Sequence, residues 1–167
     1  PDGDLRQELG ACLASLRRGS LTADERVGCL AALREAGRRA WRLRAFPVQL
    51  AGVLGLHEGY LTEMGTGEGK TLVAALAAVL GGWRGRPCHV VTVNDYLAER
   101  DAANFGTIAS WTGLTVACVK AGMSPRERWQ AYRADVVYTT AKELLAGFLR
   151  DRLALGESAT PERMAVQ

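Results

Sequence analysis

Short apolar runs alternate with helical stretches after residue 59, and this order constrains the fold more than any other feature of the sequence. Strands are expected where β-branched and other apolar residues gather, at 60–64, 89–93, 114–119 and 135–139. Helices are expected between and after them, at 70–81, from Asn94 or Asp95 to about 111, and at 141–154. Repeated strand–helix units form right-handed crossovers and a parallel sheet covered on both faces. The sequence therefore predicts an α/β fold.

Helices are also expected before residue 59. Apolar residues recur at helical spacing over 5–18 and 22–43, and a Thr–x–x–Glu capping box opens the second stretch. Pro47 has the backbone angle suited to the first turn of a third helix, over 48–56.

A further helix start is expected later in the chain. Ser124, Pro125 and Glu127 provide a cap, a first-turn proline and a capping-box acid in order.

A glycine-rich segment, Met64–Thr71, lies between the first expected strand and a long apolar helix. Glycines let such a loop turn tightly and aim its N–H groups inward, and the positive end of the next helix attracts anions. Lys70 is then expected at the β and γ phosphates of a nucleotide, and the Thr71 hydroxyl at Mg²⁺. Met64 replaces the first glycine of the general motif, which leaves the helicase-type variant T-G-x-G-K-T. The fold prediction is therefore a RecA-like, helicase-type P-loop domain.

Composition limits the other function classes. The chain is 48% hydrophobic and 23% charged, and it has no apolar run of the length that a membrane span requires. A formal charge of +3 is too small to indicate a nucleic-acid binder, and the basic excess lies in the first 46 residues. Four cysteines without paired spacing predict neither a zinc site nor a disulfide framework, and they favour a reducing compartment.

The rest of a hydrolytic site is missing from the sequence. Phosphoryl transfer in P-loop motors needs an acidic pair on a later strand and an arginine from a second domain. Asp95, Asp101 and Asp135 are the acidic candidates, and each is expected to be a cap or a surface group. His57 and His89 lack partners at metal or triad spacing, so surface or strand-end positions are expected for them. We therefore expect an excised piece that binds nucleotide weakly and turns it over negligibly.

Three segments resemble one family. Glu63–Thr71, E-M-G-T-G-E-G-K-T, is similar to the phosphate loop of the SecA preprotein translocase ATPases, and Val91–Asp101, V-T-V-N-D-Y-L-A-E-R-D, is similar to a stretch specific to that family. Phe46–Leu50 resembles the segment whose Gln recognises adenine, which implies that Gln49 pairs with adenine N6 and N7. The resemblance implies Lys70 and Thr71 as catalytic residues, Thr71 as the Mg²⁺ ligand, and ATP or ADP bound by Leu43, Phe46, Gln49, Thr66, Gly67, Glu68, Gly69, Lys70 and Thr71.

The resemblance also has departures. Over residues 139–151 the chain matches the family pattern only at the ends of the segment, and Pro47 and Gly65 replace acidic and basic residues that are common in the family. These differences indicate a divergent or accessory member. Asn94 and Asp95 stand where nucleic-acid helicases have a proline and a basic residue, and an added acid there repels a polyanion.

The resemblance implies a motor that couples ATP hydrolysis to the movement of unfolded polypeptide across the cytoplasmic membrane. Its partners would be preproteins and a membrane channel, and its location the cytoplasm with peripheral membrane contact. The implied organisation is a helical segment at 1–42, the N-terminal portion of the first nucleotide-binding domain at 43–155, and a linker or truncated element at 156–167. Two alternatives stay open: a fragment of a superfamily 2 nucleic-acid helicase, and a nucleotide-binding scaffold that does not hydrolyse ATP.

Overall fold

The computed structural model describes residues 1–19, 21–158, 160 and 163–166. In this part of the chain the α-helices are α1 (Asp2–Arg17), α2 (Ala23–Trp41), α3 (Pro47–His57), α4 (Lys70–Gly82), α5 (Asp95–Thr112), α6 (Pro125–Ala131) and α7 (Ala141–Leu155). The strands are β1 (Cys88–Thr92), β2 (Val116–Cys118) and β3 (Val136–Thr140), and all pair in parallel in the order β1-β3-β2. The predicted α/β class is confirmed.

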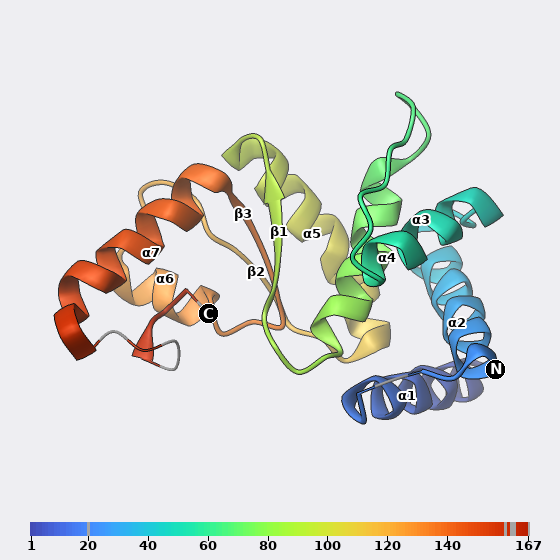
Figure 1. Ribbon diagram of the computed structural model, residues 1–167. Coiled ribbons are helices and arrows are strands. Elements are labelled where there is room, and N and C mark those ends of the chain that lie inside the picture. Colours follow the sequence, from blue (N-terminus) through green and yellow to red (C-terminus); the bar gives the residue numbers. More distant parts are fainter. Residues whose placement is uncertain (20, 159, 161–162, 167) are drawn as a thin grey trace.

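The central strand β3 is apolar enough to be covered on both faces. All five of its residues are buried, as expected for a strand inside a parallel sheet. Helices α4 and α5 lie against one face of the sheet, and α6 and α7 lie against the other (Figure 1). Strand β1 occupies an edge of this sheet, in register with β3 from Cys88 opposite Val136 to Thr92 opposite Thr140.

The N-terminal helices share a core with the helices of the sheet. Leu9 in α1, Leu33 in α2 and Leu76 in α4 are buried in one apolar cluster. The Trp41 indole nitrogen donates a hydrogen bond of 2.9 Å to the Asn104 carbonyl oxygen in α5. Residues on both sides of the predicted division at 42/43 therefore stabilise each other, and the division itself stays a prediction.

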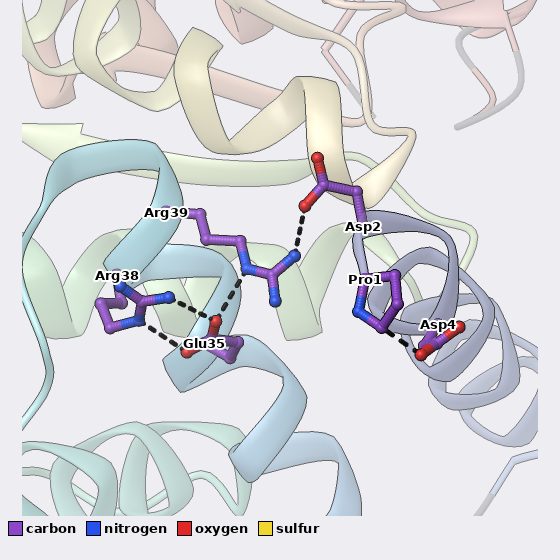
Figure 2. A network of polar contacts seen from close by, with 6 residues as sticks. All are labelled: Pro1, Asp2, Asp4, Glu35, Arg38 and Arg39. Atoms are coloured by element: carbon purple, nitrogen blue, oxygen red, sulfur yellow. Dashed lines mark hydrogen bonds and ion pairs between the residues drawn. The ribbon is translucent and has the colours of Figure 1, made fainter.

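A polar network joins α1 to α2 at the surface (Figure 2). The Glu35 carboxylate accepts hydrogen bonds from Arg38 and from Arg39, with the Arg39 Nε atom 2.7 Å from Glu35 Oε1. Arg39 also reaches across to Asp2 at the start of α1, at 2.5 Å. These hydrogen bonds lower the pKa of Glu35 to about 2, because both guanidinium groups favour the ionised carboxylate.

The expected helix starts are confirmed. Thr22 caps α2 in a capping box with Glu25, and Ser124 caps α6 in the same way with Glu127. Of the two candidates before α5, Asn94 is the cap, and its side-chain oxygen accepts a 2.8 Å hydrogen bond from the Leu97 N–H group. These starts were predictable because each depends on residues three positions apart.

The expected strand at Tyr60–Met64 is wrong. This segment is an irregular part of the long connection between α3 and α4, which projects away from the sheet in Figure 1. A strand needs a neighbouring strand to pair its backbone N–H and C=O groups, and none of the described strands pairs with this segment. Leu61 is fully exposed here, at 100%. The apolar composition of this segment therefore did not predict whether a neighbouring strand would be present to pair with it.

Residues 165 and 166 pack back against α7. The segment 156–167, predicted to be a linker or a truncated element, begins with a 3₁₀ turn, Gly156–Ser158, while its residues 159, 161, 162 and 167 lie outside the described residues. The Asp151 carboxylate accepts hydrogen bonds from the N–H groups of Ala165 and Val166, at 2.8 and 3.1 Å. Within the described ranges, no helix combines the length and the hydrophobicity needed to cross a bilayer.

Candidate nucleotide site

The glycine-rich loop leads into α4 on the side of the molecule toward which the strands run. The connection 83–87 joins the end of α4 to the start of β1, so the beginning of α4 lies toward the carboxyl end of that strand (Figure 1). Ligands of open α/β sheets bind at this end of the strands. Gly67 and Gly69 have φ angles of +84° and +83°, a conformation that glycine adopts without steric cost. The loop therefore depends on glycine at both positions.

Lys70 is folded back over the loop that precedes it. It is the first residue of α4, and its Nζ atom donates a 2.7 Å hydrogen bond to the Gly65 carbonyl oxygen. The Thr71 side chain is exposed beside it and makes no hydrogen bond in the described part of the chain. An ammonium group and a free hydroxyl thus stand together at a helix N-terminus, where an anion is favoured.

The loop satisfies part of its own hydrogen-bonding capacity. The Glu68 N–H group donates to the Gly65 carbonyl oxygen at 3.4 Å, and the Glu68 carboxylate accepts from the Gly65 N–H group at 3.0 Å. Within the described ranges, the N–H groups of Gly67, Gly69, Lys70 and Thr71 have no hydrogen-bond partner. A helix start leaves its first N–H groups without backbone acceptors, so these donors are available to an anion.

Gln49 connects α3 to this loop. Its Nε2 atom donates a 2.7 Å hydrogen bond to the Glu68 carbonyl oxygen, 19 positions away in the sequence. Its Oε1 atom accepts a 2.9 Å hydrogen bond from the Phe46 N–H group. The side chain is only 8% exposed, because it lies between the start of α3 and the loop. The predicted adenine-binding residue therefore lies next to the predicted phosphate-binding loop.

The other predicted site residues are less closely connected. Leu43 and Phe46 are exposed in the segment that leads into α3, and Thr66 is exposed in the loop. In the described part of the chain, no hydrogen bond or ion pair joins the side chain of any of these three to the rest of the predicted site. Their assignment to a nucleotide stays a prediction.

The three acidic candidates have other partners. The Asp95 carboxylate accepts from the Ala121 N–H group at 3.0 Å, and Asp101 pairs with Arg100 at 2.7 Å. Asp135 accepts from both the N–H and the hydroxyl of Thr115, at 2.7 and 2.6 Å, where β2 and β3 begin. Each carboxylate is thus half-buried and engaged in a structural contact, and none of the three caps a helix, since Asn94 rather than Asp95 caps α5.

Both histidines lie outside the loop. His57 is the last residue of α3, beside Arg84, and burial followed by the nearby Arg84 charge lowers its pKa. His89 is the second residue of β1, and its ring packs against Tyr132 with ring centroids 5.7 Å apart. Burial lowers the pKa of His89. The neutral forms are therefore favoured, and neither side chain contacts the candidate site.

Sequence reasoning overlooked Gly65. Its carbonyl oxygen is the partner of Lys70, and its N–H group is the partner of the Glu68 carboxylate. The Glu68 carboxylate reaches back three positions to the Gly65 N–H group, as the acid of a capping box does, and this spacing was the available signal. The direct contact between Gln49 and the loop was also overlooked, and no local spacing predicts it.

Comparison with known proteins decides the family. The profile of the family described as "SecA DEAD-like domain" matches residues 1–166, nearly the whole chain. The chain belongs to the SecA DEAD-like domain family. The match begins at residue 1, so the N-terminal helices α1 and α2 fall within the same family domain as the loop.

Curated relatives agree with this family. The protein translocase subunit SecA 2 of Magnetococcus marinus is 49% identical over 162 residues, which cover 95% of this chain and 25% of the relative. The SecA 2 subunit of Chlorobium chlorochromatii is 48% identical, over 96% of this chain and 24% of the relative. The SecA subunit of Rickettsia canadensis is 45% identical, over 91% and 17%. The chain thus spans a quarter or less of the length of these SecA relatives.

Proposed function

We propose that this chain is the ATP-binding part of a SecA-type motor that couples ATP hydrolysis to polypeptide movement. The observation that carries the proposal is the start of α4, where Lys70 and Thr71 follow a loop with two left-handed glycines and four N–H groups without partners. Such a cradle suits the terminal phosphates of a nucleotide. Membership of the SecA DEAD-like domain family supports the same assignment.

Phosphate binding would exchange the loop's internal contacts for stronger ones. Lys70 now donates to the neutral Gly65 carbonyl, and a phosphate oxygen would replace this acceptor because it carries a charge opposite to that of the ammonium group. The Glu68 carboxylate, now on the Gly65 N–H group, would move away because it repels an arriving anion. The side chains of this loop would therefore rearrange when nucleotide binds.

The Thr71 hydroxyl fits a Mg²⁺ ligand, since it is exposed at the loop and has no hydrogen-bond partner in the described ranges. A bound Mg²⁺ would neutralise part of the charge on the phosphates. Gln49 would read adenine through the amide donor and acceptor that its present contacts leave free, with Leu43 and Phe46 near the base. The chain alone is expected to have negligible turnover, because its described acidic candidates are engaged elsewhere.

In the intact motor the expected partners are preproteins and a membrane channel, and the expected location is the cytoplasm with peripheral contact to the cytoplasmic membrane. The names of the relatives, protein translocase subunits, support this proposal. Nucleic acid is not an expected substrate. Asn94 and Asp95 begin α5 just after β1, and the Asp95 charge there disfavours a phosphate backbone.

ADP binding tests the proposal. The chain should bind ADP with Mg²⁺ in a calorimetric titration, and Lys70→Ala should weaken binding at least tenfold, because a charged hydrogen bond contributes about 1.5–3 kcal/mol. Lys142→Ala is the matched control, since Lys142 is exposed on α7 and should leave ADP binding unchanged. Equal affinities for the unaltered chain and Lys70→Ala would contradict a phosphate site at this loop.

A further inference from the structure

Gln49 makes two hydrogen bonds within the protein, and they serve different segments. Its Oε1 atom accepts from the Phe46 N–H group at the start of α3, and its Nε2 atom donates to the Glu68 carbonyl oxygen in the loop. The side chain is 8% exposed, so both contacts are protected from water. A residue that only read a bound base would not need to hold the loop in this way.

The contact with Glu68 fixes the direction of the next N–H group. In a trans peptide the C=O and N–H bonds point in opposite directions, and the chain contains no cis peptide in its described part. Because Gln49 holds the Glu68 carbonyl on the α3 side, the Gly69 N–H group points away from α3. This N–H group has no partner in the described ranges, and it lies directly before Lys70 and Thr71.

The fit between Gln49 and the loop is close. A Cβ atom at Gly69 would lie 2.5 Å from Gln49 Nε2, which is closer than atoms approach without displacement. At Gly67, which has the same backbone conformation, a Cβ atom would meet nothing within 4 Å. A side chain at position 69 would thus displace the Gln49 amide, and the positive φ angle there also favours glycine.

We infer that Gln49 is a positioning residue for the phosphate cradle, in addition to its proposed contact with adenine. It orients the Glu68–Gly69 peptide so that the Gly69 N–H group faces the phosphates. An amide carries two N–H protons and two oxygen lone pairs, so one of each remains for adenine. The same side chain then links base recognition to the geometry of the phosphate loop. This inference rests on the proposed nucleotide function.

Inorganic tripolyphosphate separates the two roles, because it has phosphates and no base. Gln49→Met keeps the length of the side chain and removes both polar groups, and we expect it to weaken tripolyphosphate binding three- to tenfold, the value of one hydrogen bond. Gln49→Glu keeps an acceptor for the Phe46 N–H group and removes the donor to Glu68, and it should weaken tripolyphosphate binding at least as much. Gln130→Met, on the exposed side of α6, is the matched control and should change neither the affinity for tripolyphosphate nor the affinity for ADP.

The possible results distinguish a failure of the positioning role from a failure of the proposed nucleotide function. If Gln49→Met weakens ADP binding and leaves tripolyphosphate binding unchanged, Gln49 reads only the base, and the positioning role is overturned. If the unaltered chain binds neither ADP nor tripolyphosphate, the proposed function fails in that first measurement and the inference fails with it. Thermal unfolding of each variant, together with the ¹⁵N resonance of the Gly69 amide, distinguishes a local change in the loop from loss of the fold.

A second pair of variants tests the contact without changing Gln49 itself. Gly69→Ala and Gly67→Ala impose the same backbone cost, but only Gly69→Ala displaces Gln49. Gly69→Ala should therefore weaken tripolyphosphate binding several-fold more than Gly67→Ala does. In a Gln49→Ala background this excess should disappear, and an excess that persists would contradict the positioning role.

Discussion

On the face of the sheet covered by α4 and α5, most of the buried side chains are apolar, whereas the face covered by α6 and α7 buries an ion pair. The first face contributes Val136 and Tyr138 of β3 to a large cluster that extends to α1 and α2. The second has a small apolar cluster around Tyr132 and Val137, beside the pair formed by Arg128 and Glu143. Strand β3 thus contributes side chains to two different apolar clusters, because successive side chains along a strand point to opposite faces of the sheet.

The difference indicates which interactions stabilise the packing on each face. A large apolar cluster tolerates the loss of one polar contact, since many van der Waals contacts remain. A small cluster depends more on the hydrogen bonds and charges around it. Arg128 of α6 pairs with Glu143 of α7, and it also donates to the Met123 carbonyl oxygen, in the connection before α6, at 3.0 Å. The contact between α6 and α7 should therefore be more sensitive to a single change of charge than the contact between α4 and α5.

The largest expected effect is at Glu143. Glu143→Ala should lower the free energy of unfolding by about 3–5 kcal/mol, because it leaves the buried Arg128 charge without its partner. The two side chains are only 7% and 13% exposed. Urea unfolding measures the change. Glu99→Ala is the control, since Glu99 and Lys120 form an exposed pair, and its cost should stay below about 1 kcal/mol.

A double variant sharpens this first prediction. Arg128→Met combined with Glu143→Met removes both charges and should be less destabilising than Glu143→Ala, since no unpaired charge remains. If Glu143→Ala and Glu99→Ala cost the same, the second face does not depend on its ion pair, and the contrast between the two faces is wrong.

The apolar face should respond to lost volume. Leu76→Ala in α4 should cost about 2–5 kcal/mol, because the side chain is fully buried and its removal leaves a cavity. Leu153→Ala in α7 is the control, since Leu153 is 85% exposed, and it should change the free energy of unfolding by less than about 0.5 kcal/mol. The same urea titrations measure both, and similar values would place Leu76 outside the core.

The smallest effect is expected in the surface network of α1 and α2 (Figure 2), where pH is the probe. Hydrogen bonds from Arg38 and Arg39 lower the pKa of Glu35 to about 2, below its value of about 4.3 in an unfolded chain. A lowered pKa contributes stability above pH 4.3 that is lost as the pH falls toward 2. Glu35→Gln should therefore flatten the dependence of unfolding free energy on pH in this window.

Glu8→Gln is the control for the pH experiment. Glu8 lies on α1 and makes no ion pair in the described part of the chain, so comparing Glu8→Gln with Glu35→Gln separates the loss of a surface charge from the loss of the network. A slope that Glu35→Gln leaves unaltered would mean that the network persists in the unfolded chain or exchanges with solvent in the folded one.

Sequence reasoning succeeded where a signal was local. The starts of α2, α5 and α6 depend on a cap and the backbone N–H group three positions later, and all three were predicted. The loop was recognised for a similar reason, because glycine is favoured at the φ angles of +84° and +83° that the structure has at positions 67 and 69. Strand bounds shifted by only one or two residues for β1, β2 and β3.

The same reasoning failed where a segment depended on a distant partner. Tyr60–Met64 has the composition of a strand but no strand beside it in the described part of the chain, so it is irregular. The role predicted for Gln49 from the sequence was incomplete for the same reason. Its contact with Glu68 spans 19 positions, and α3, the connection and α4 all have to be in place before the two groups meet.

By itself the sequence determined the α/β class, the helix starts, the resemblance to the family and the position of the glycine-rich loop, because spacing over a few residues limits backbone angles and nearby hydrogen bonds. Only the tertiary structure decided which predicted strands form a sheet, which side chains hold the loop, and where a buried ion pair replaces apolar packing. Those outcomes depend on groups brought together across long stretches of chain, and only the folded arrangement supplies their partners.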